Sequence, residues 1–274
     1  KYLGLANSAP IAAIAGVLTL ATAGLMWLFM KVVPKSQFVG YGQVHHVAEK
    51  HDEEPGFLEG LNLLVTKGYL FGIFLIISIY EIIITIIDFQ FKSAAKAVYP
   101  AEIDFSEYLA NYAVATGIVA TACVLLGINS IQRMMGIAAS LMLVPILVAV
   151  GVVMVWADPT SLNVLFWVMV IGKAVNYALN SPTMKQLYIP TTKDTKYKAQ
   201  AWIEMFGSRG SKAAGSGVNT MKLFFKKGYG AAGVSMFATV SAISSLGLIG
   251  IWLIVVVYVA KTYNKAVAED KLVC

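Results

Sequence analysis

Between Tyr69 and Lys92 the chain reads YLFGIFLIISIYEIIITIIDFQFK, an apolar run long enough to cross a lipid bilayer as one helix. Glu81, Asp88 and Lys92 interrupt this run at successive spacings of seven and four residues. Such spacings place all three side chains on one face of an α-helix. Because a charge at the bilayer centre costs about 2.5–3.5 kcal/mol, that face must meet a wet cavity or side chains of opposite charge.

Composition extends this interpretation to the whole chain. Among its 274 residues, 58% are hydrophobic and 13% are charged, and the mean hydropathy is +0.72. Soluble domains are nearer about 45–50% apolar and about 25% charged. We therefore expect an all-α, polytopic membrane bundle, whose net charge of +6 reflects topology and not a nucleic-acid partner. The two cysteines, Cys123 and Cys274, provide neither a disulfide framework nor a metal site.

Apolar runs predict six spans, and a less apolar segment predicts a seventh. The six runs cover about residues 5–30, 68–91, 106–128, 136–157, 162–182 and 234–260. The seventh candidate, at about 197–224, is poor in Leu and Ile and rich in Gly, Ser and Ala. Small residues let helices approach closely in membranes. We favour a full span there, although a re-entrant or interfacial helix fits the same composition.

The longest polar stretch, residues 31–66, is predicted to be a cytoplasmic linker that ends in an interfacial helix. A metal site or regulatory loop is the alternative, but His45, His46 and His51 lack cysteine neighbours and a four-residue helical spacing, so no metal is expected. With the linker in the cytoplasm and seven spans, twelve Lys and Arg residues fall on the cytoplasmic side and six on the other. Membrane-spanning proteins show the same excess of Lys and Arg on their cytoplasmic side.

Three polar clusters inside the predicted spans contain nine of the ten candidate binding residues; the tenth is Lys185, and Glu204 is not one of the ten. The clusters are Glu81, Asp88 and Lys92; Lys173, Asn176, Tyr177 and Asn180; and Glu204, Arg209 and Lys212. Lys and Arg bind phosphate oxygens, and amide or phenol groups can meet a base edge. The structural alternative for each cluster is ion pairing between helices or a lysine reaching toward the interface. The GxxxxGK[ST] spacing of a P-loop is absent around Arg209.

Three motifs follow one another from Tyr188 to Ser216: YIP, KDTKYKA and GSRGSKAAGS. Together with DFQFK at residues 88–92, Asn111 and the 129–136 loop, they resemble the ATP/ADP translocase family of obligate intracellular bacteria and plastids. The likeness covers most of the chain after the linker. It implies a major-facilitator-like fold that works by alternating access. It also implies exchange of a nucleoside triphosphate for a diphosphate across the bacterial inner membrane, without catalysis or a cofactor.

On this resemblance the chain is the carboxyl-terminal half of a twelve-helix carrier. Residues 1–30 would be the last helix of a missing amino-terminal half, 31–66 the central linker, and 67–274 a six-helix bundle. The implied partners are a nucleotide substrate, the lipid bilayer and the missing half.

Family positions carry over only in part. Asp88 stands where the family usually has Glu, whereas Lys92 and Lys173 match family lysines. Asn176 replaces a second family lysine, so another nucleotide remains open as the substrate.

The second set of family positions lies near the YIP motif. Members commonly read Lys-Glu just before it, where this chain has Met184 and Lys185. Arg209 and Lys212 stand at a frequent basic pair. Two alternatives to nucleotide antiport therefore stay open. One is a proton-coupled transporter of another nucleotide or anionic metabolite, with Glu81 or Asp88 titrating, and the other is a half-length fragment that does not transport.

Overall fold

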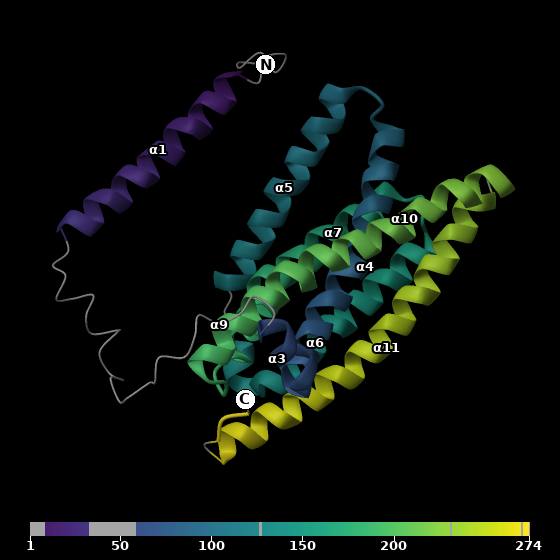
Figure 1. Cartoon of the computed structure of the whole chain (residues 1–274). Helices are drawn as coiled ribbons and strands as arrows, with labels where there is room; N and C mark the ends of the chain where they lie inside the picture. The colour runs from purple at the N-terminus through teal and green to yellow at the C-terminus, as the bar shows by residue number, and fades with distance from the viewer. Residues whose placement is uncertain (1–8, 33–58, 126–127, 231, 270, 274) are drawn as a thin grey trace. The chain divides into compact units, whose positions relative to one another are not determined.

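The computed structural model describes residues 9–32, 59–125, 128–230, 232–269 and 271–273, and all regular structure in these ranges is helical (Figure 1). The chain divides into two units, residues 1–55 and 56–274. The first unit contributes α1 (Ala9–Val32), whose residues Ala13–Phe29 form a shorter apolar helical stretch. The prediction of an all-α membrane bundle is confirmed.

The second unit contains the remaining helices. They are α3 (Glu59–Thr66), α4 (Gly68–Val98), α5 (Glu102–Leu125), α6 (Ile128–Ala157), α7 (Leu162–Val175), α8 (Ser181–Gln186), α9 (Lys193–Trp202), α10 (Arg209–Tyr229) and α11 (Ala232–Ala268). Among the described residues, five segments are long and apolar enough to cross a membrane: Gly68–Val98, Glu102–Leu125, Gly136–Ala157, Leu162–Gln186 and Ala232–Ala268. The chain is therefore a multi-pass membrane protein.

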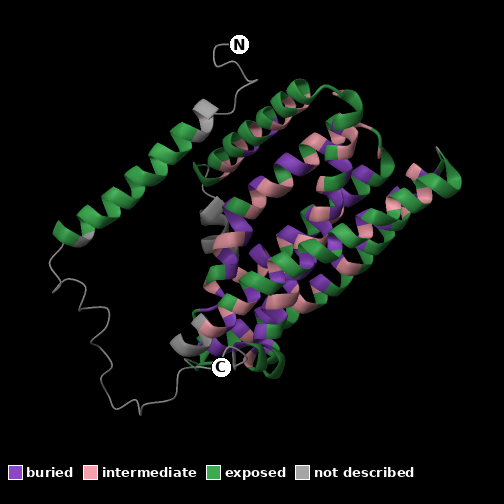
Figure 2. Cartoon of the chain, turned by 45° about the horizontal axis from the view of Figure 1, so that its top comes forward, coloured by how far each residue is buried: buried purple, intermediate pink, exposed green. Residues whose placement is uncertain are grey.

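The helix that carries the opening sequence, α4, lies at the centre of the bundle. It packs against α7, α10 and α11, and most of its isoleucine side chains are buried along its whole length. Tyr69 and Phe91 mark the two ends of this buried face, and the Trp252 ring of α11 meets Tyr80 in its middle. Figure 2 shows buried positions gathered inside the bundle and exposed ones on its outward faces. Many large apolar side chains are exposed on the described helices, among them Ile146, Val153 and Ile254, as contact with lipid favours.

Helix ends depart from the predicted spans where polar residues continue the helix. The α4 helix runs past residue 91 to Val98 and stops where Tyr99 precedes Pro100, because proline disfavours helical geometry in the residue before it. The α6 helix bends at Gly136, whose φ of 80° suits glycine, and the apolar part begins there as predicted.

The predicted seventh segment, 197–224, is helical and lies within the bundle. Its α10 portion packs against α4 and α11 through Ser211, Gly215 and Asn219, which are buried at four-residue intervals. A Cβ atom added at Gly215 would lie 3.0 Å from the Ile82 carbonyl oxygen and from the Thr85 Cβ. The absence of a side chain at Gly215 is therefore what lets α10 approach α4. Whether this segment spans the bilayer stays a prediction.

We expect Gly215→Leu to lower the thermal unfolding temperature and the folded yield of the purified protein, because its side chain must push α10 away from α4. Overpacking of this kind costs about 1–3 kcal/mol. Gly217→Leu is the matched control, since a Cβ there meets no atom within 4 Å. Equal melting of the two variants would contradict this account of the contact.

Candidate functional site

Two π-helical turns flank the candidate site. They are η1 (Asn176–Asn180), which joins α7 to α8, and η2 (Ile203–Ser208), which joins α9 to α10. In η1 the Ser181 N–H donates to the Asn176 carbonyl, one residue wider than in an α-helix. Pro182 follows at once, and a wider turn relieves the clash that proline makes with the preceding helical turn. Single π-turns recur at functional sites.

A cavity of about 560 Å³ lies between α4, the end of α7 and α10. Its lining is half polar in character and mixes both signs of charge with hydroxyl, amide and phenol groups. The lining residues are Tyr80, Glu81, Ile84, Thr85, Asp88, Lys173, Asn176, Tyr177, Lys212 and Ser216. Three further cavities, lined by described residues of α4, α6, α7, α10 and α11, lack this combination of lysines and carboxylates.

Asp88 joins α4 to α7 by an ion pair at one end of this cavity. Its Oδ2 lies 2.6 Å from the Lys92 Nζ, and its Oδ1 lies 3.6 Å from the Lys173 Nζ. Lys173 also lies over the Tyr112 ring of α5, 5.3 Å from the ring centroid. One carboxylate thus faces two ammonium groups, and an excess of positive charge remains beside it.

Glu81 joins α4 to the η2–α10 region in the same way. Its Oε2 lies 3.7 Å from the Lys212 Nζ, and its Oε1 accepts a hydrogen bond of 3.1 Å from the Ser208 hydroxyl. The Glu81 side chain is 18% exposed and that of Lys212 is 56% exposed. The lysine can therefore leave the carboxylate for another anion without crossing an apolar barrier.

The structure brings six of the ten predicted site residues to this cavity: Glu81, Asp88, Lys173, Asn176, Tyr177 and Lys212. Lys92 is outside the lining and touches it through Asp88. Asn180 is buried and donates to the Asn176 side chain over 2.8 Å, which fixes the orientation of that amide.

Lys185 and Arg209 are exposed and are not among the cavity's lining residues. Glu204, for which interhelical pairing with a basic residue was the alternative, accepts a hydrogen bond from Gln200, 2.7 Å away. Whether these residues bind a substrate stays a prediction.

Sequence reasoning left out several groups that contact the site. Ser216 lies four residues after Lys212, so the helical spacing could have found it. Tyr112 and Ser208 gave no signal, because their contribution depends on how α5 and η2 pack.

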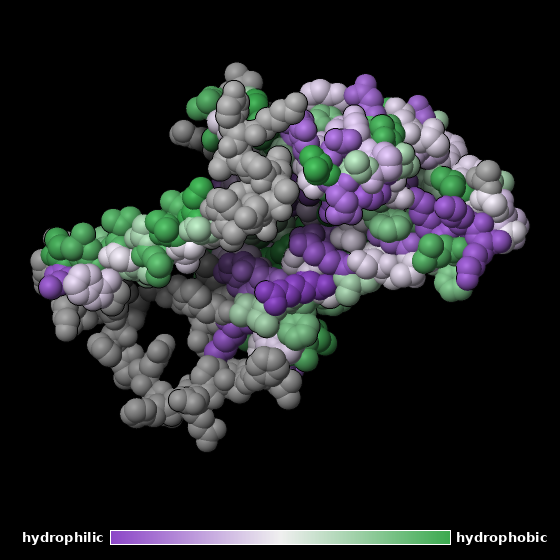
Figure 3. Space-filling view, turned by 90° about the horizontal axis from the view of Figure 1, so that it is seen from above, coloured by the Kyte–Doolittle hydropathy of each residue, from purple (hydrophilic) through white to green (hydrophobic). Residues whose placement is uncertain are grey.

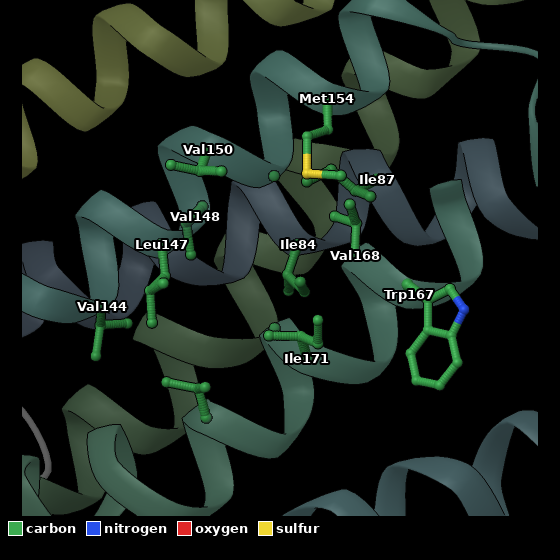
Figure 4. A pocket seen from close by; sticks show the side chains of 13 residues that line it. Ile84, Ile87, Val144, Leu147, Val148, Val150, Met154, Trp167, Val168 and Ile171 are labelled. Carbon is green, nitrogen blue, oxygen red and sulfur yellow. The ribbon is translucent and has the colours of Figure 1, made fainter. Parts of the chain in front are cut away.

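A second cavity, of about 180 Å³, is apolar and suits no charged solute. Aliphatic side chains of α4, α6 and α7 converge on it, with Trp167 at its edge (Figure 4). Ile84 lines both cavities and separates the apolar one from the charged one.

Metal ligands do not gather in the described parts of the chain, where no group of three or more His, Cys, Asp or Glu residues forms a possible site. His45, His46 and His51 lie outside the described residues.

The chain resembles known carriers over most of its length. The family model described as TLC ATP/ADP transporter matches residues 4–159 and 154–263. The ADP,ATP carrier protein 1 of Rickettsia typhi is 27% identical over 180 residues, which is 58% of this chain and 36% of the relative. The ADP,ATP carrier protein 3 of Rickettsia prowazekii is 22% identical over 223 residues, which is 74% of this chain and 44% of the relative. No solved structure matches the chain.

These matches thus span less than half the length of either relative. The family model nevertheless covers well over half of this chain, and the resemblance drawn from its motifs points the same way. The chain belongs to the TLC ATP/ADP transporter family.

Proposed function

We propose that this chain is the carboxyl-terminal half of a nucleotide antiporter, which exchanges a nucleoside triphosphate for a diphosphate across the bacterial inner membrane by alternating access. The observation that carries the proposal is the cavity in which Lys173 and Lys212 lie among phenol, amide and hydroxyl groups. Ammonium and hydroxyl groups bind phosphate oxygens, and phenol rings stack on bases. Family membership and the ADP,ATP carrier relatives support the same substrate class.

The ion pairs suit a carrier that must release what it binds. Lys173 is paired with Asp88 and Lys212 with Glu81, and Lys92 adds a further positive charge beside Asp88. An incoming phosphate chain competes with the carboxylates for the lysines. Partly exposed pairs of this kind contribute only about 0–1 kcal/mol to stability. Replacing the carboxylates by phosphate as partners of the lysines, and the reverse step, therefore cost little free energy.

The other wall of the pathway would come from an amino-terminal half. Carriers of this kind place their substrate near the bilayer midplane, at the interface of two repeats. Glu81 and Asp88 lie well inside α4, and Lys173 lies near the middle of the apolar segment Leu162–Gln186, which suits that position. Lys212 lies in the first turn of α10, which continues from η2.

The direct test is uptake of a panel of labelled nucleoside di- and triphosphates by cells that express the full-length gene. We expect uptake that depends on a nucleotide preloaded on the opposite side. Uptake of no member of the panel, at a verified level of membrane protein, would contradict the proposal.

Proton-coupled transport is the second candidate, and the carboxylates in the cavity favour it. Protonation of Glu81 or Asp88 would free a lysine for an anion. Collapse of the proton gradient by an uncoupler should then stop uptake, whereas pure exchange should follow only the counter-substrate.

A non-transporting fragment is the third candidate, and an upstream reading frame that encodes five further spans would argue against it.

For topology we propose that residues 31–66 are cytoplasmic and that seven helices span the membrane. Reporter fusions at Asp158 and Lys271 should then report opposite sides, with Lys271 inside. The reason is that α7, the α9–α10 segment and α11 make three crossings between the two positions. If both fusions report the same side, the α9–α10 segment does not cross.

Tyr177 is the side chain that we expect to stack on the nucleobase. It lines the cavity next to Asn176, yet 61% of it is exposed, so its ring is free to meet a ligand. Stacking contributes about 1–3 kcal/mol per base. Tyr177→Ala should therefore raise the KM for nucleotide about tenfold or more, while Tyr177→Phe, which keeps the ring, should change it little. An unchanged KM in Tyr177→Ala would place the base elsewhere.

A further inference from the structure

A third cavity, of about 310 Å³, lies at one end of the bundle and is not part of the candidate site. It is bounded by the last turns of α4 and α10, the first turns of α11 and the α6–α7 connection. Its polar lining consists of Gln90, Ser93, Thr160, Lys222 and Lys226. Ten residues of α10 separate Lys222 from Lys212 of the first cavity, which is about 15 Å along a helix.

The Lys222 side chain is held in place by the wall of this cavity. Its Nζ donates a hydrogen bond of 2.8 Å to the Ser93 hydroxyl and lies 5.3 Å from the centroid of the Phe89 ring. Lys226 follows four residues later on the same face of α10 and lines the same space. Two ammonium groups so arranged repel each other unless an anion lies between them.

No carboxylate supplies that anion in the described part of the chain. Neither Asp nor Glu lines the cavity, and neither lysine forms an ion pair with a described carboxylate. Nearby lysines differ in this respect, because Lys92 pairs with Asp88 and Lys96 with Glu102. Asp158, just before the α6–α7 turn, is engaged with Thr160 and the Ser161 N–H.

The rest of the lining is apolar and comes from small and aromatic side chains. Ala94, Ala97 and Val98 of α4 face Val234, Phe237 and Ala238 of α11. In Figure 3 hydrophilic side chains gather beside hydrophobic ones at the right of the view, where α10 turns into α11. A ligand for this cavity therefore combines a compact anionic group with an apolar or flat body.

We propose that Lys222 and Lys226 bind a phosphate-bearing anion at the end of the α10–α11 hairpin, separately from the cavity between α4, α7 and α10. Phosphate oxygens accept several charge-assisted hydrogen bonds at once, which two lysines and a serine hydroxyl can donate. Basic pockets between spanning helices bind lipid head groups in this way. The phosphate can belong to an anionic phospholipid or to a soluble nucleotide, and the two sources are separable.

The test compares Lys222→Gln/Lys226→Gln with the parent protein, using the detergent-solubilised product of the full-length gene. Phosphatidylglycerol, phosphatidylcholine and inorganic pyrophosphate are titrated while thermal unfolding is followed, since a ligand of the folded state raises the midpoint. We expect the parent to be stabilised by phosphatidylglycerol or pyrophosphate more than by phosphatidylcholine. The double variant should need at least about tenfold more of that anion for the same shift.

Lys227→Gln is the matched control, because it removes one charge from the same helix at a residue outside the lining. A shift with phosphatidylglycerol alone assigns the site to a lipid head group, and a shift with pyrophosphate assigns it to a soluble phosphate. Dependence on Lys222 and Lys226 separates this site from any binding at Lys173 and Lys212. If the double variant is not recovered folded, Lys226→Gln, at an exposed side chain, gives the same comparison.

Two results would overturn the proposal. One is that no phosphate-bearing anion stabilises the parent more than phosphatidylcholine does. The other is that Lys227→Gln weakens the effect as much as the cavity variants do, which would mean that only the overall charge of the hairpin matters.

Discussion

Replacing Lys173 by alanine in the full-length gene product should lower nucleotide exchange about ten- to a hundredfold while the protein stays in the membrane. A hydrogen bond to a charged group contributes about 1.5–3 kcal/mol, and Lys173 offers such bonds from the cavity lining. The fold should survive because Asp88 keeps its shorter contact, 2.6 Å, with Lys92. Initial rates of exchange in proteoliposomes at matched protein content measure the effect.

Lys92→Ala is the control for this prediction. Lys92 carries the same charge and contacts the same carboxylate, but it is 50% exposed and lies outside the cavity lining. Exchange in that variant should fall much less than in Lys173→Ala. Equal losses in the two variants would mean that the positive charge around Asp88 matters and that a contact between Lys173 and the substrate does not. Wild-type exchange rates in Lys173→Ala would show that Lys173 is not part of the binding site.

The cost of charge in lipid made much of this cavity predictable from the sequence. Glu81 and Asp88 stand out in an isoleucine-rich run, and their helical spacing places them on one face. Lys173 stands out in the same way in another span. The structure then joins Lys173 to Asp88. The pairing was one of several open alternatives, because sequence spacing within one helix says little about a second helix.

The π-turns explain where helical periodicity failed. Spacing arguments assume 3.6 residues per turn, and a wider turn rotates everything beyond it. Asn180 was expected to continue the polar face of Lys173, whereas Lys185 was a candidate through the family resemblance alone. Asn180, the last residue of η1, is buried and donates a hydrogen bond to the Asn176 side chain, and Lys185 is exposed on α8. Arg209 lies outside the cavity that Lys212 lines although both residues follow η2, so the π-turn does not account for that difference.

The choice of α10 as a helix of the bundle rested on small residues and not on hydropathy. Gly215 approaches the α4 backbone as closely as that composition suggested. Hydropathy alone would have missed the helix, because α10 is not among the five segments that are apolar enough to span.

Asp88→Asn should destabilise the protein more than Lys173→Ala does, because it leaves both Lys92 and Lys173 facing an uncharged amide. An exposed ion pair contributes at most about 1 kcal/mol, and loss of one partner from a buried pair costs about 3–5 kcal/mol. Because Asp88 is 22% exposed and Lys173 is 32% exposed, we expect a cost between these limits, about 1–3 kcal/mol. We expect less protein in the membrane fraction and a lower unfolding temperature for the purified variant.

The double variant Asp88→Asn/Lys173→Met separates the structural role of the pair from its role in transport. Removing Lys173 as well leaves only Lys92 without its carboxylate, and that side chain already reaches water. Protein level and unfolding temperature should therefore recover while exchange does not, since the phosphate contact is gone. Recovery of both would show that Lys173 serves only to neutralise Asp88. A single Asp88→Asn variant as stable as the parent would show that the pair contributes nothing to the bundle, and the carboxylate would then be free to act on the substrate or on a proton.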